Sequence, residues 1–178
     1  MVPFCSAIWG IFTLPLTDTR SFTASPEEEA VSDPEFEKLI HLSPEALNSI
    51  SEKKIMALAG STLENLYWER SNEHLREDPA KVAALCRIAA IGNYLPALGE
   101  YGNILYAGRG VPQNQREALT WYLKSAQAGD EETITFLDRL LREETLFDDF
   151  KVTEVSEHAK IRNIIEEVYS KLQSHWEN

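Results

Sequence analysis

The sequence predicts an all-α protein, a short α-solenoid of helical hairpins with a capping helix at each end. Residues 97–129 contain two stretches in which apolar residues recur every three or four positions, and a glycine-rich turn separates them. A related pattern occurs 37 to 38 residues earlier. No segment shows the alternation of a sheet strand. Because one such hairpin cannot bury its own apolar face, it is expected to stack on copies of itself.

The N-terminal residues 1–25 leave two interpretations open, a signal peptide or a disordered tail. Residues 1–16 are apolar but hold two prolines, and they are too short for a membrane span, so stable membrane insertion is not expected. A polar stretch with small residues follows, as a signal-peptide cleavage region requires. The first basic residue is Arg20, after the apolar run, which is atypical of a signal peptide. With a signal peptide the protein would be periplasmic or secreted; otherwise it would be cytoplasmic.

Residues 26–51 are predicted to be a polar linker and an N-terminal capping helix. The pair Asp33 and Pro34 opens a short helix with an apolar face. Ser43 followed by Pro44 is a second helix start, with proline at the first helical position.

The best-defined unit begins with a helix from about residue 97 to residue 107. Its apolar face falls on one side of a helical period and consists of Ala97, Tyr101, Gly102 and Leu105. A glycine inside a helix is costly, so Gly102 predicts the close approach of another backbone. Gly108 is expected to end the helix in a left-handed conformation, and residues 110–112 to continue a tight turn.

The second helix of this unit starts at Asn114. Its side chain is expected to cap the helix, with Glu117 three residues later completing a pattern like a capping box. Large and small residues then recur at helical spacing, at Ala118, Trp121, Tyr122, Ser125 and Ala126. Gly129 closes the unit.

This segment resembles a Sel1-like repeat, a relative of the tetratricopeptide repeats. Ten positions carry the resemblance: Ala97, Gly102, Gly108, Gly110, Val111, Ala118, Trp121, Tyr122, Ala126 and Gly129. The chain departs from the family pattern at Tyr101, Leu105 and Asn114, where apolar bulk or capping ability is kept. The resemblance implies a solenoid of helix pairs that binds other proteins.

Two weaker copies flank this repeat, so that residues 52–145 are predicted to be the repeat region. In the earlier copy, Ala59, Leu63 and Tyr67 match the first helix, and Ala89 and Gly92 match the end of the second. That copy lacks the glycine turn and has Ala84 in place of tryptophan. A third copy begins at Thr133 and Leu137.

Residues 146–178 are predicted to form a C-terminal capping helix. Residues 148–151 are expected to be a loop, and Ser156 to begin the helix. An apolar stripe at Ile161, Ile164, Ile165, Val168 and Leu172 would cover the end of the stack.

The net charge of the chain argues against nucleic acid as a partner. The chain has 178 residues and a net charge of −12, so it lacks the basic surface that nucleic acid requires. Ten carboxylates and three basic residues lie between Asp130 and Glu157. This stretch is either a solvated face or a docking surface for a basic partner.

No catalytic or metal-binding set emerges from the sequence, and no cofactor is expected. Cys86 lies among apolar residues and is interpreted as a buried thiol. The four histidines are scattered, without a metal-ligand pattern. The alternative function is a hydrolase, because cysteine-rich Sel1 relatives are linked to β-lactam hydrolysis. Ser51 and Lys54 form a Ser-x-x-Lys motif, but this short pattern often occurs by chance. The other motifs of such enzymes are missing.

We therefore expect a non-catalytic module that binds a protein, as an adaptor or as an inhibitor of the immunity type. An exposed aromatic residue on a helical stack is a typical anchor for a partner. The predicted binding residues are Trp68, Glu100, Asn103, Tyr106 and Arg109. The protein itself is expected to be a monomer or a weak homo-oligomer.

Overall fold

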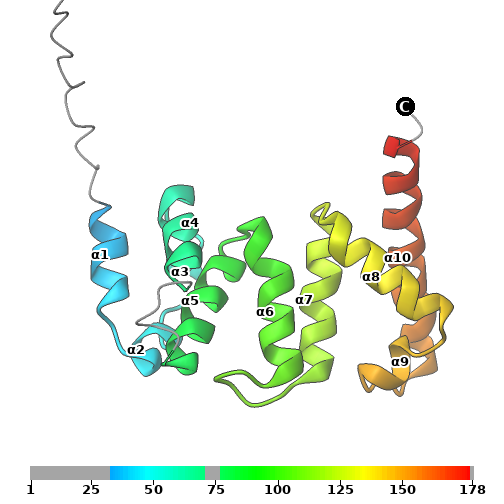
Figure 1. Ribbon diagram of the computed structural model, residues 1–178, viewed down its shortest axis with the longest axis horizontal. Helices are drawn as coiled ribbons and strands as arrows, with labels where there is room; N and C mark the ends of the chain where they lie inside the picture. The colour runs from blue at the N-terminus through cyan, green and yellow to red at the C-terminus, as the bar shows by residue number, and fades with distance from the viewer. Residues whose placement is uncertain (1–32, 71–76, 177–178) are drawn as a thin grey trace, which may run out of the picture. The chain divides into compact units, whose positions relative to one another are not determined.

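The computed structural model describes residues 33–70 and 77–176, and these residues form helices without strands (Figure 1). The predicted signal peptide or tail, and most of the connection before Pro79, lie outside the described residues. The helices are α1 (Pro34–Ile40), α2 (Pro44–Asn48), α3 (Glu52–Ile55), α4 (Gly60–Glu69), α5 (Pro79–Ile91), α6 (Leu95–Ala107), α7 (Gln115–Gln127), α8 (Glu131–Arg142), α9 (Leu146–Asp149) and α10 (Val155–Trp176). The all-α prediction is confirmed for this part of the chain. None of these helices combines the length and the apolar run that crossing a bilayer requires.

Polar side chains cap most of the helix starts that the sequence predicted. Asp33 accepts hydrogen bonds from two backbone N–H groups of α1, and Ser43 accepts one at the start of α2. At α7, Asn114 Oδ1 accepts from the Glu117 N–H at 3.1 Å. The Glu117 carboxylate accepts from the Asn114 side-chain amide at 3.0 Å. In a standard capping box it would accept from the backbone N–H of Asn114, which here donates to the Leu105 carbonyl.

Helices α5 to α9 all end in the same C-terminal motif. In each case a left-handed residue follows the helix, and the next N–H donates to the carbonyl five residues back, which closes a Schellman motif. The left-handed residues are Asn93, Gly108, Gly129, Glu144 and Lys151. The prediction that Gly92 corresponds to Gly129 is therefore wrong by one position. Gly92 has φ −72°, and Asn93 takes the left-handed conformation instead.

Each helix from α4 to α8 packs against the next one along the chain (Figure 1). Helix α1 packs on α4, both α2 and α3 pack on α5, and α10 packs on α7 and α8. The interior divides into two apolar clusters. One surrounds Leu47, Leu66 and Leu85, and the larger one includes residues from Tyr67 to Leu172. In α10, Ile161, Ile165 and Leu172 are buried, as the predicted stripe requires.

The two predicted copies differ at their first alanine. Ala97 is fully buried inside α6, whereas Ala59 is exposed and precedes α4 as its N-cap. The reason is local, because the residues before Ala59 are used by the one-turn helix α3 and its closing turn. The expectation of a loop at residues 148–151 is also wrong, since α9 extends to Asp149 and Phe150 is completely buried behind it.

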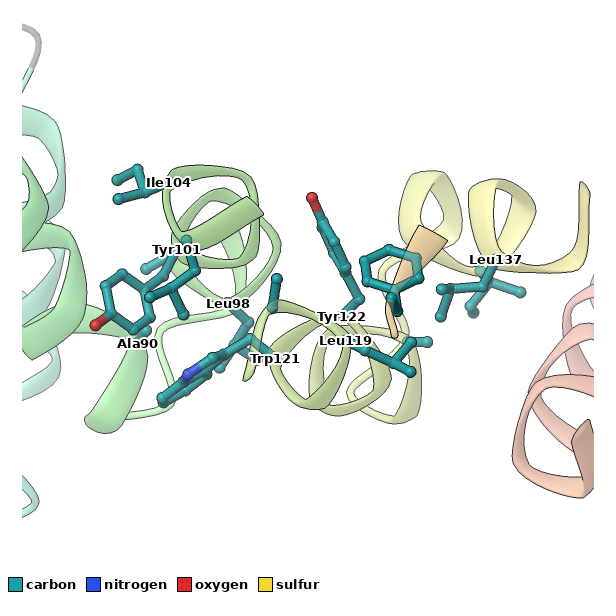
Figure 2. Close-up of a cluster of buried hydrophobic side chains, with 14 of the residues drawn as sticks. Ala90, Leu98, Tyr101, Ile104, Leu119, Trp121, Tyr122 and Leu137 are labelled. Carbon is teal, nitrogen blue, oxygen red and sulfur yellow. The ribbon is translucent and has the colours of Figure 1, made fainter. Parts of the chain in front are cut away.

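The largest cluster is centred on aromatic side chains of α6 and α7 (Figure 2). Tyr101 and Trp121 meet edge to face, with ring centroids 5.2 Å apart, while the Tyr122 ring lies between α6 and α8. Gly102 faces Tyr122, and a Cβ built on this glycine would lie 2.9 Å from the ring. The prediction of a close backbone at Gly102 is therefore wrong, because a tyrosine ring occupies that space.

Gly110 is the position where the fold tolerates an added side chain least. Its φ is +73°, and a Cβ there would overlap the carbonyl group of Pro79 at the start of α5. We expect Gly110→Ala to lower the free energy of unfolding by about 2–4 kcal/mol, through left-handed strain and the backbone clash. Urea denaturation followed by circular dichroism measures this change.

Gly60→Ala is the matched control, because an added Cβ at Gly60 meets no atom within 4 Å. Its effect should stay within about 0.5 kcal/mol of the wild type. Equal stability of the two variants would mean that the turn at Gly110 does not rest on Pro79.

Candidate functional site

A groove of about 600 Å³ opens beside the first turns of α6 and α8. Aromatic and apolar side chains supply much of its wall, and three carboxylates face it. None of the residues lining it is a lysine, arginine or histidine. The lining residues are Tyr67, Leu95, Pro96, Gly99, Glu100, Asn103, Tyr122, Asp130, Glu132, Thr133 and Phe136.

Three of the predicted binding residues form one hydrogen-bonded group at this groove. The Asn103 side-chain amide donates to Glu100 Oε2 at 3.2 Å, and Arg109 donates to Glu100 Oε1 at 3.3 Å. The Tyr122 hydroxyl donates to Asn103 Oδ1 at 2.7 Å. Glu100 and Asn103 line the groove, whereas Arg109 approaches Glu100 without lining it. The contacts hold the polar wall of the groove in one conformation.

The second polar wall is built on Asp130, the N-cap of α8. Its Oδ2 accepts hydrogen bonds from the hydroxyls of Ser125 at 2.7 Å and Thr133 at 2.6 Å. Gly99 leaves room for this group, because a Cβ there would lie 3.1 Å from Asp130 Oδ2. Glu132 is exposed and makes no hydrogen bond or ion pair within the described chain. The Asp130 carboxylate is thus held in place by hydrogen bonds, whereas the Glu132 carboxylate has no partner among the described residues.

The two predicted aromatic anchors differ in their surroundings. Trp68 is 55% exposed, and its ring meets the buried ring of Tyr67 edge to face at 5.3 Å. Neighbouring side chains on a helix point about 100° apart, and these two are accordingly buried to different extents. Tyr106 is half-buried, and its ring centroid lies 5.4 Å from that of Phe150. Tyr106 is therefore part of the packing rather than an exposed anchor.

Neither Trp68 nor Tyr106 lines the groove, although Tyr67 connects Trp68 to it. Sequence reasoning missed several of the lining residues, among them Leu95, Asp130, Glu132 and Phe136. The sequence contains Leu95 in α6 and an acidic first turn in α8, but it does not reveal that they lie close together. Their proximity depends on how α7 joins α6 to α8.

The candidate nucleophiles lie apart from this groove. Burial raises the pKa of the Cys86 thiol to about 12, so it is protonated at neutral pH. Ser51 is the N-cap of the one-turn helix α3, which contains Lys54. Both residues are exposed, and no hydrogen bond joins their side chains in the described structure. No group of three or more His, Cys, Asp and Glu side chains in the described ranges is arranged to hold a metal ion. The groove itself offers apolar contacts and negative charge.

Comparisons of the chain with protein-family models, curated proteins and solved structures found no match. The resemblance to Sel1-like repeats stays a prediction that rests on the residues of 97–129.

Two buried tyrosine side chains should make the free energy of unfolding decrease at alkaline pH. Burial raises the pKa of both Tyr101 and Tyr122 to about 12 from an ordinary value of 10. The folded chain then holds these protons more tightly than the unfolded chain. Their contribution is complete below pH 10 and is lost as the pH rises from 10 toward 12. Urea unfolding at a series of pH values should show this decline.

As a control, the ionisation of the tyrosine side chains in the folded protein is followed by ultraviolet difference absorbance. We expect Tyr122→Phe to remove one of the late-ionising phenols and Tyr106→Phe to leave both in place. Ionisation of all tyrosines near pH 10 in the folded state would contradict the burial of these rings.

Proposed function

We propose that this chain is a non-catalytic module that binds another protein, and that residues 52–145 are Sel1-like hairpins in a short α-solenoid with capping helices at both ends. The packing of each helix from α4 to α8 on the next supports the solenoid. The packing of α1 to α3 on one side and of α10 on the other supports the two caps. The repeat assignment is supported by the residues of 97–129 quoted above.

The observation that carries the binding function is Trp68. An indole that is 55% exposed presents a large apolar surface, and the buried Tyr67 supports it from behind. Rigid, exposed aromatic residues lose little conformational entropy on binding and supply much of the energy of protein interfaces. The groove next to Tyr67 adds a concave surface to this anchor.

The character of the site favours binding over catalysis. Its polar groups are engaged in hydrogen bonds to one another, as at Glu100, Asn103 and Asp130. Nucleophilic catalysis needs a hydroxyl or thiol that a base activates. The Thr133 hydroxyl lies 2.6 Å from Asp130, but this carboxylate caps α8 and also accepts from Ser125, so the fold accounts for the contact. An adaptor or an inhibitor of the immunity type fits these features, with a partner protein that is basic where it meets the acidic groove.

The test is affinity capture of the partner from the native source by the full chain, with identification by mass spectrometry. We expect Trp68→Ala to weaken binding of the captured partner at least about tenfold, as loss of an aromatic anchor does. Surface plasmon resonance with the identified partner measures the change. Circular dichroism should show that the variant stays folded.

Val155→Ala is the matched control, because Val155 is 79% exposed on α10, outside the groove lining. It should bind the partner as the wild type does. Equal binding by both variants and the wild type would remove Trp68 as the anchor. Turnover of a β-lactam that is lost in Ser51→Ala would overturn the non-catalytic assignment in favour of a hydrolase.

A further inference from the structure

The groove has an unbalanced charge. Glu100 is paired with Arg109, an exposed residue outside the lining. Asp130 receives hydrogen bonds from hydroxyl and backbone N–H groups, which leave its negative charge in place. Glu132 has no partner within the described residues. Two carboxylates at the start of α8 therefore have no cationic partner among the described residues.

The nearby cations are directed elsewhere. The Arg70 guanidinium lies 4.0 Å from the centre of the Tyr67 ring, and that of Arg139 lies 5.8 Å from the Phe136 ring. Both rings line the groove, but neither arginine does; Arg139 lines the adjoining hollow beyond α8. A ligand that enters this groove consequently meets carboxylates and apolar walls.

The groove continues beyond α8. A second hollow of about 590 Å³ shares Glu132 and Phe136 with it and is also lined by Glu131, Arg139 and Trp176. Trp176 is 59% exposed near the end of α10. Leu95, which is 39% exposed, lies in the first hollow. The two hollows together offer room for a peptide segment, with apolar contacts in both and Glu132 at their common boundary.

Building on the proposed function, we propose that these joined hollows bind a segment of the partner protein in which a lysine or arginine side chain lies between apolar residues. The basic side chain pairs with Asp130 and Glu132, and the neighbouring apolar side chains contact Leu95 and Phe136. Charge complementarity selects this occupant, since a basic group balances the two carboxylates and an acidic segment would be repelled.

Glu132 is the residue to change, because it carries charge without a structural hydrogen bond. Asp130 caps α8, so its replacement would also disturb the fold. The probe is a fluorescein-labelled peptide of leucine, glycine and lysine, and its counterpart has glutamate in place of lysine. Fluorescence anisotropy with the full chain should show binding of the lysine peptide alone, with an affinity that falls as salt is added.

We expect Glu132→Gln to weaken binding of the lysine peptide about three- to fivefold, the effect of losing one exposed ion pair. Glu132→Lys should weaken it further. The matched controls are Glu143→Gln and Glu143→Lys, which change the same charges at the other end of α8, outside both hollows. These controls should bind within about twofold of the wild type if general charge screening is small.

The proposal is overturned if the lysine peptide does not bind, or if the Glu143 variants lose as much affinity as the Glu132 variants, which would indicate net charge alone. The captured partner separates this result from the protein-binding function. If Trp68→Ala loses the partner and Glu132→Lys keeps it, the basic segment is wrong and the binding function stands. If both variants keep the partner, Trp68 is not the anchor and the basic segment is wrong.

Discussion

The side chain of Tyr122 fixes how three helices meet. Its ring lies against Gly102 of α6, in space that any larger residue would occupy. Its hydroxyl donates to Asn103 one residue later in that helix. The same ring packs on Phe136 of α8 and on Phe150, with centroids 5.5 and 5.7 Å apart. One aromatic residue of α7 thus sets the positions of α6 and α8, and it forms part of the groove between them.

The groove is consequently part of the packing that holds the helices together. Asp130 joins the end of α7 to the start of α8 through Ser125 and Thr133, and the Gly99 position of α6 leaves space for that group. Such preorganised walls lose little freedom when a ligand binds. Trp68 follows the same rule, because its ring rests on Tyr67, which is buried. At the groove and at Trp68, exposed residues are supported by buried residues next to them.

Local signals predicted the helices well wherever one residue is sufficient to determine the backbone. Asp33, Ser43 and Asn114 cap helices because their short polar side chains accept backbone hydrogen bonds. The predictions failed where contacts with other residues determine the backbone conformation. Asn93 rather than Gly92 turns left-handed, since the Schellman geometry sets the position and asparagine tolerates it. Helix α9 forms where a loop was expected, because Phe150 is drawn into the core.

The sequence by itself determined that this chain is helical where the structure describes it and that α1, α2 and α7 are capped by Asp33, Ser43 and Asn114. Periodicity and capping are local properties, so residue order carries them. Only the tertiary structure decided that Tyr106 is packed on Phe150 and that Glu100 and Asn103 share a groove with Asp130 and Glu132. These contacts join residues of different helices, and their distances depend on side-chain packing that no local pattern encodes.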